Sequence, residues 1–206
     1  MLIDKVRPLS EHRFFIGGDD LFVMPHNLKT YLASLVYKDG TDPKTKEYYI
    51  GRRFNREKFN GGYRKSHPFG FGPYNCGGEG YALSQATLRT FLANIDDVKY
   101  CSANARTSME DVMIARCLHH LGIQYIDTRD AKGRERFHNF DPGTLFHWKL
   151  RGPKEKKNWY EQYNKEWGIL VGKDCCAPDS VSFHYIKQAS MVRHIHALVD
   201  SCNVAE

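Results

Sequence analysis

The sequence predicts an α/β protein, because short apolar runs typical of buried strands alternate with segments whose apolar residues recur at helical spacing. With 206 residues, of which 41% are hydrophobic, the chain suits one globular domain over residues 1–206, or two very small ones. The expected strands lie at residues 14–16, 21–24, 47–51, 123–126 and 181–186, and the expected helices begin at Pro25, Ser84 and Ser108 and near Met191.

The first expected strand ends in two glycines and two acidic residues, Gly17 to Asp20. Acidic residues at a strand end often present carboxylates to a metal ion. The same composition is typical of a simple turn, which this segment taken alone favours. Pro25 then suits the first turn of a helix. The predicted apolar face of that helix carries Leu28, Tyr31, Leu32 and Leu35.

A Gly-rich stretch at residues 77–80 is the next feature with chemical interest. Three glycines in four positions imply a backbone that bends sharply or approaches a ligand closely. The stretch precedes a helix capped by Ser84, and such a turn can cradle phosphate, although it matches neither the P-loop nor the dinucleotide fingerprint. Residues 52–72 before it are basic, aromatic and Gly-rich, and we expect a long surface loop there. The predicted apolar residues of the helix are Leu88, Phe91 and Leu92.

The helix predicted at residues 108–122 carries two acidic residues in its first turn. Ser108 suits the N-cap position, and Gly122 suits the end of the helix. Glu110 and Asp111 lie where the helix dipole favours negative charge, so they can serve as caps or supply a catalytic base. The residues alone leave both interpretations open. The apolar stripe of this helix consists of Val112, Ala115, Leu118 and Leu121.

The C-terminal third combines a charged segment, an aromatic cluster and a last strand. Residues 127–136 are expected to form an exposed loop. In the strand at 181–186, alternation predicts that His184 faces away from Phe183 and Tyr185. The aromatic cluster fits either a platform for sugar rings or a packed core. Its members are Trp159, Tyr160, Tyr163 and Trp167.

Composition narrows the classes of function. The net charge of +6 fits an anionic ligand or an ordinary solvated surface. No Lys/Arg stripe interleaved with aromatic residues occurs, which argues against nucleic acid as a partner. The six cysteines form no C-x-x-C pair, so a zinc site is not expected, and their even number fits either three disulfides or free thiols. No apolar run is long enough to cross a membrane, and the first residues are too polar for a signal peptide.

Five stretches carry a family resemblance. In chain order they are residues 19–23, 77–84, 109–117, 127–130 with 133–138, and 175–176 with 182–185. Together they resemble the β1,3-glycosyltransferases, most closely the core 1 β1,3-galactosyltransferases, which are the glycoprotein-N-acetylgalactosamine 3-β-galactosyltransferases. Each stretch alone is a weak motif, but five in the same order at matching spacing are specific.

The resemblance implies a GT-A-like mixed sheet flanked by helices. It also implies Mn²⁺-dependent, inverting transfer of galactose from UDP-galactose to the 3-hydroxyl of GalNAc on a glycoprotein acceptor, with a homodimer as one option. Members of the family are type II membrane proteins of the Golgi with a lumenal catalytic domain. This chain would therefore meet the membrane only through an anchor that it does not itself contain.

The resemblance also assigns roles to residues of this chain. Asp20 and His184, with Asp19, match the metal ligands, and Asp111 matches the position of the base. Cys101 and Cys117 are the implied disulfide. The residues implied to contact donor or acceptor are Gly77, Gly78, Gly80, Tyr81, Glu110, Trp159 and Tyr160.

Two departures from the family pattern leave alternatives open. Gly18 stands where the family's metal motif has its first carboxylate. The chain also begins about where the nucleotide-binding half of its relatives ends, so we expect it to be a C-terminal portion with the metal motif, acceptor site and catalytic residues. A non-catalytic member that acts as a folding partner or glycan-binding protein is one alternative. A related β1,3-glycosyltransferase with another donor is a second.

Overall fold

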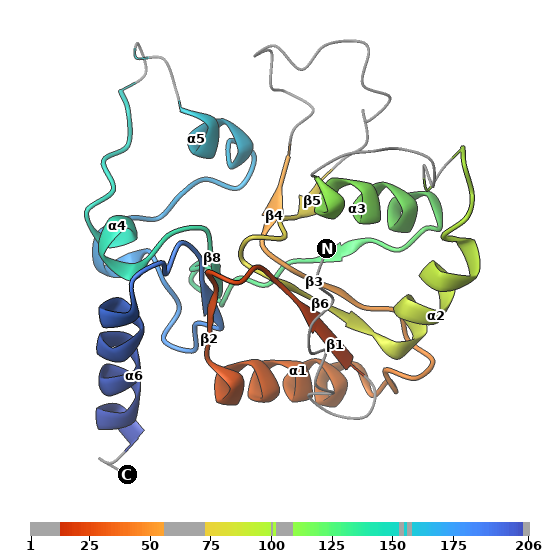
Figure 1. Ribbon diagram of the computed structural model, residues 1–206, viewed down its shortest axis with the longest axis horizontal. Coiled ribbons are helices and arrows are strands. Elements are labelled where there is room, and N and C mark those ends of the chain that lie inside the picture. The colour runs from red at the N-terminus through yellow and green to blue at the C-terminus, as the bar shows by residue number, and fades with distance from the viewer. Residues whose placement is uncertain are drawn as a thin grey trace.

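A computed structural model describes residues 13–55, 73–99, 101, 109–152, 155 and 158–203 of the chain. It contains three sheets and six α-helices, and the helices flank the sheets (Figure 1). The alternation of strands and helices expected from the sequence is confirmed. Most of the predicted surface loop at residues 52–72, and the predicted cap Ser108, lie outside the described residues.

The main sheet has four strands in the order β1-β6-β3-β7. Strand β6 runs antiparallel to both of its neighbours, whereas β7 runs parallel to β3. A sheet with both kinds of pairing needs a crossover between its parallel strands, and the chain supplies helices for it. The strands are β1 (Arg13–Ile16), β3 (Tyr49–Gly51), β6 (Tyr81–Ser84) and β7 (Tyr125–Ile126).

Helices cover both faces of the main sheet. Helix α1 (Pro25–Asp39) packs Leu28 and Leu32 against Ile50 and Ala82 on one face. Helix α3 (Glu110–His120) packs against Tyr49, Tyr81 and Leu83 on the other. Helix α2 (Gln85–Asn94) follows β6 directly. Neighbouring positions of one strand therefore belong to different cores, as the alternation of side chains along a strand requires.

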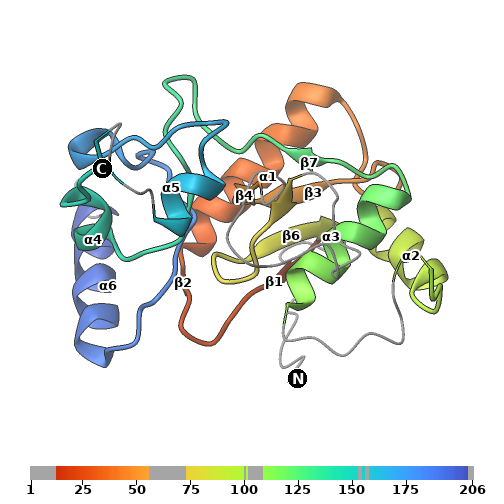
Figure 2. The same cartoon turned by 90° about the horizontal axis from the view of Figure 1, so that it is seen from above.

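Beside the main sheet lie two smaller sheets, and the C-terminal half adds three more α-helices. Figures 1 and 2 both place α4, α5 and α6 together, at the end of the molecule away from α2. The second sheet has the order β2-β9-β8, formed by β2 (Phe22–Val23), β8 (Phe137–His138) and β9 (Ser182–Phe183). The third pairs β4 (Arg53–Phe54) with β5 (Tyr74–Asn75). The remaining helices are α4 (Pro142–Phe146), α5 (Trp159–Tyr163), the 3-10 turn η1 (Gly172–Asp174) and α6 (Ala189–Asn203).

Local capping signals place the helix ends. Helix α1 begins at Pro25, and the Ser84 hydroxyl accepts the Thr87 N–H at 3.1 Å at the start of α2. Gly122, with φ of +80°, follows α3 and lets the chain turn away from the helix. At the start of α3, Met109 is the N-cap residue and supplies no side-chain hydrogen bond.

Two expectations about local structure are wrong. Arg52, Arg53 and Phe54 are buried around the short strand β4, and are not part of a surface loop. The last strand ends at Phe183.

The prediction that His184 faces away from Tyr185 is also wrong. Tyr185 has a left-handed backbone with φ of +59°, which breaks the alternation of side chains. The His184 and Tyr185 rings consequently stack, with their centroids 4.0 Å apart.

The cysteines form two disulfides among the described residues. One joins Cys101 to Cys117, the pair that the family resemblance implies, and the other joins the adjacent Cys175 and Cys176. Cys76 is a free thiol. Within the described part of the chain, no helix has the length and apolar character needed to span a membrane.

Candidate active site

The Gly-rich turn at residues 77–80 joins β5 to β6 and lies at the centre of the candidate site. The Gly80 N–H donates to the Gly77 carbonyl at 3.0 Å and closes the turn. Gly80 has φ of +75°, and a Cβ there would overlap the Phe15 ring. A residue other than glycine would therefore be strained at this position.

The first turn of α3 contacts one end of the Gly-rich turn. Asp111 Oδ2 accepts the Gly77 N–H at 3.0 Å, and its Oδ1 accepts the Val112 N–H at 2.7 Å. A Cβ on Gly77 would lie only 2.5 Å from Glu110 Oε1, so Glu110 also borders the turn. Asp111 is therefore held by two backbone donors. Its bond to Val112 satisfies an N–H in the first turn of α3, in line with the capping interpretation, and its bond to Gly77 adds a tertiary contact.

The His184 ring lies against the same turn at Gly78 and pairs with Asp20. His184 Nε2 lies 3.0 Å from Asp20 Oδ1. A Cβ on Gly78 would overlap the His184 imidazole, so the absence of a side chain at Gly78 makes room for that ring. The Ile186 N–H donates to the Asp20 carbonyl at 2.9 Å and fixes the loop that carries Asp20.

The electrostatics of this pair favour neutral imidazole. Burial lowers the pKa of His184, and the Asp20 carboxylate offsets part of that effect. Neutral imidazole is the form that binds metal ions, because the ring nitrogen then offers its lone pair. Lys187 Nζ lies 4.0 Å from the second Asp20 oxygen.

The donor set of this pair fits part of the coordination sphere of a divalent cation. Asp20 and His184 offer one oxygen and one nitrogen side by side, which suits two positions of a borderline cation whose other ligands are phosphate oxygens or water. Asp19 is exposed. Within the described ranges, no group of three His, Cys, Asp or Glu side chains is close enough together to hold a metal by itself. The residues fit a cation that is shared with a substrate.

Glu79 is a site residue that the sequence analysis did not single out. Its side chain is fully buried, and its backbone carbonyl accepts the hydroxyl of Ser182 in β9 at 2.6 Å. Burial raises the pKa of Glu79 to about 7, although Cys76, Arg52 and Asn139 act in the opposite direction. The only signal in the sequence is an acidic residue between glycines, which is also typical of an exposed turn.

The predicted aromatic contacts divide into exposed and buried side chains. Trp159 is 40% exposed at the start of α5 and remains accessible to a ligand. Tyr160 is 3% exposed and packs between Phe140 and Trp148, with ring centroids 5.0 Å from each. Tyr81 is fully buried against Tyr49. The core interpretation is therefore confirmed for Tyr160, whereas the platform stays a prediction for Trp159.

The protein is a mixed α/β protein with a GT-A-like glycosyltransferase fold. This class is defined by its mixed sheet, by the flanking helices, and by the acidic and imidazole groups around a Gly-rich turn. No family model matches the chain. The glycoprotein-N-acetylgalactosamine 3-beta-galactosyltransferase 1 of Xenopus laevis is 30% identical to it over 178 residues. Over most of its own length the chain is therefore similar to a core 1 β1,3-galactosyltransferase. The matched region is 86% of this chain but only 42% of the relative, so the chain spans less than half of the relative's length.

Proposed function

We propose that the protein is an inverting glycosyltransferase that moves galactose from UDP-galactose to the 3-hydroxyl of O-linked GalNAc on glycoproteins. The observation that carries this proposal is that Asp111 and His184 contact one Gly-rich turn, and that Asp20 pairs with His184 beside it. The name of the Xenopus laevis relative, which specifies a galactosyltransferase and a GalNAc-bearing glycoprotein, supports the choice of substrates. A Golgi-lumenal location is part of the same proposal, and a disulfide between Cys101 and Cys117 suits it.

Asp111 is the proposed base that removes the proton of the acceptor hydroxyl. Its two oxygens each accept one backbone N–H, and each keeps a lone pair for a further hydrogen bond. The fixed carboxylate therefore has a defined direction, which in-line attack on the anomeric carbon requires. Glu110 is the proposed acceptor contact beside it. Partial burial and the Asp111 charge raise the pKa of Glu110.

Asp20 and His184 are the proposed protein ligands of Mn²⁺. When bound, the ion would neutralise the negative charge of the departing diphosphate. Gly77 and Gly78 leave the backbone without side chains between these ligands and Asp111. A donor sugar can therefore lie against the turn, and the remaining ligands of the ion would come from the donor phosphates and water.

A transfer assay with UDP-galactose, a GalNAc-threonine peptide and Mn²⁺ tests this function. We expect galactosyl-peptide to form and its formation to stop when the metal is chelated. Asp20→Asn should lower the rate by about 100-fold or more, because it removes a charged ligand of the ion. Asp19→Asn is the matched control and should lower it by less than about fivefold, in line with a weak exposed-charge effect. Equal losses in both variants would reject Asp20 as a ligand.

A non-catalytic, glycan-binding function is the second candidate, and Gly18 favours it. A glycine stands where a third carboxylate would precede Asp19 and Asp20. This candidate predicts that the GalNAc peptide binds without turnover and independently of Mn²⁺. Calorimetry with the peptide, in the presence and absence of the metal, separates it from the enzyme.

A further inference from the structure

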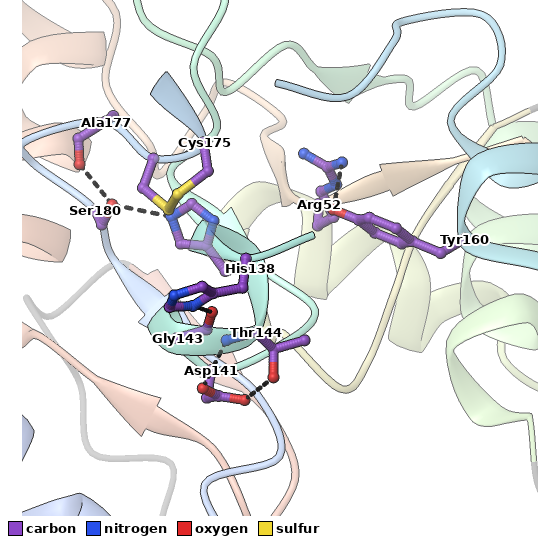
Figure 3. Close-up of a disulfide and its surroundings, with 11 residues drawn as sticks. Arg52, His138, Asp141, Gly143, Thr144, Tyr160, Cys175, Ala177 and Ser180 are labelled. Carbon is purple, nitrogen blue, oxygen red and sulfur yellow. Dashed lines mark hydrogen bonds between the residues drawn. A yellow bond between two sulfur atoms is a disulfide. The ribbon is translucent and has the colours of Figure 1, made fainter. Parts of the chain in front are cut away.

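A cavity of about 210 Å³ lies apart from the Gly-rich turn, between the loop that precedes β8, helix α5 and the segment before Cys175. Figure 3 shows parts of its lining: Arg52 and Tyr160 lie together, and the Cys175 disulfide lies near His138. The residues used in the argument below are Arg52, Arg129, Lys132, Glu135, Tyr160 and Trp167, all of which line the cavity.

The charged lining is mainly cationic. The lining contains three cationic side chains, those of Arg52, Arg129 and Lys132, and one carboxylate, that of Glu135. Burial and the Arg52 charge lower the pKa of His138, which also lines the cavity, to about 3, so its ring is neutral at physiological pH. A small, partly open cavity with this balance attracts an anion, because water screens charges on its half-buried walls less than charges on a flat surface.

Arg52 contributes a fixed positive charge to the lining. Its side chain is 2% exposed, and it pairs with Glu135 and donates to Asn164. These partners hold the guanidinium group in place at the cavity wall.

Arg129 and Lys132 stand closer to the solvent side of the same cavity. Arg129 pairs with Asp127 at 2.8 Å, and the same carboxylate pairs with Arg53, also at 2.8 Å. The guanidinium groups of Arg53 and Arg129 thus share the single carboxylate of Asp127, so these three side chains together carry a net positive charge. Lys132 is exposed, and no ion pair to it occurs among the described residues.

The uncharged walls fit a ring rather than a bare ion. Tyr160 and Trp167 line the cavity together with Leu145 and Ile169. Aromatic rings offer flat apolar faces to the C–H groups of a sugar, and the Trp167 ring is already fixed by the Arg53 guanidinium 4.7 Å from its centroid. We propose that this cavity is a separate binding site for a sugar ring that bears a carboxylate or a sulfate.

Binding of glucuronate, glucose and inorganic sulfate to the full chain tests this proposal. Trp167 fluorescence and the amide signals of Gly133 and Gly168, which also line the cavity, report occupancy. We expect glucuronate to bind at least tenfold more tightly than glucose and than sulfate, with an affinity that falls as salt rises. Equal binding of sulfate would overturn the sugar-ring part of the proposal, and equal binding of glucose would overturn the anionic part.

Variants locate the binding. Lys132→Ala should weaken glucuronate binding by about three- to fivefold, and Arg129→Ala combined with Lys132→Ala by at least about tenfold. Arg53 keeps its partner Asp127 in both variants, so the fold is expected to persist. Lys173→Ala, an exposed lysine outside the lining, is the matched control and should bind as the unaltered chain does. Undiminished binding in the double variant would overturn the site whether or not the protein transfers galactose.

Discussion

Asp111→Asn is expected to lower galactose transfer by about 10²- to 10⁴-fold while the affinity for UDP with Mn²⁺ stays within about threefold of the unaltered protein. Asparagine keeps the shape of the side chain but cannot take a proton. Its amide can still accept one of the two backbone N–H groups that hold Asp111. The loss should therefore appear in kcat rather than in the binding of the donor.

Glu110→Gln is the matched control for this variant, because it changes the neighbouring carboxylate in the same way. We expect a loss of about tenfold or less, mainly in the KM for the acceptor. Urea unfolding of both variants would establish that the fold persists. Turnover in Asp111→Asn within tenfold of the unaltered protein would reject Asp111 as the base, and a larger loss in Glu110→Gln would assign the role to Glu110.

Glu79→Gln is expected to stabilise the protein at pH 8 by about 3 kcal/mol more than at pH 4.5. Burial raises the pKa of Glu79 from 4.5 to about 7 in the folded state, so the folded chain binds this proton more tightly than the unfolded chain. The resulting stabilisation is complete below pH 4.5 and is lost as the pH rises through 7. Glutamine mimics the neutral carboxyl at every pH, and the pKa difference corresponds to about 3 kcal/mol.

Urea unfolding at pH 4.5, 6 and 8 measures this effect as the difference in free energy between variant and unaltered chain. Glu47→Gln changes an exposed carboxylate and is the control, for which we expect the same small difference at all three pH values. A difference for Glu79→Gln that does not change with pH would show that Arg52 and the surrounding dipoles fully compensate the burial of the charge.

The features that were predicted correctly depend on interactions between residues that are close together in the sequence. Proline fixes the first turn of α1, the Ser84 hydroxyl caps α2, and glycine at position 122 permits the turn after α3. The burial of Arg52 could not be predicted in this way. It depends on Glu135 and Asn164, which are far away in sequence and form its hydrogen bonds only after the chain has folded.

In the candidate site, too, single residues could be predicted from the sequence, whereas their arrangement in space could not. Motif resemblance pointed to Asp20, Asp111 and His184 one at a time. The contacts of Asp111 and His184 with one turn depend on the absence of side chains at Gly77 and Gly78, which only tertiary packing reveals. Glu79 remained unnoticed because an acidic residue among glycines is typical of a solvated turn, and its burial results from packing against the β9 strand through Ser182.

The central claim is that the Gly-rich turn brings the metal ligands and the base together in one site. Titration of the isotope-labelled protein with Mn²⁺ in the presence of UDP tests it directly, because the paramagnetic ion broadens the amide signals of nearby residues. The proposed site predicts that the signals of Asp20, Gly78, Asp111 and His184 disappear first, while that of Gly40 at the far end of α1 persists. Broadening that spares Gly78 and His184, or that affects Gly40 equally, would contradict the account.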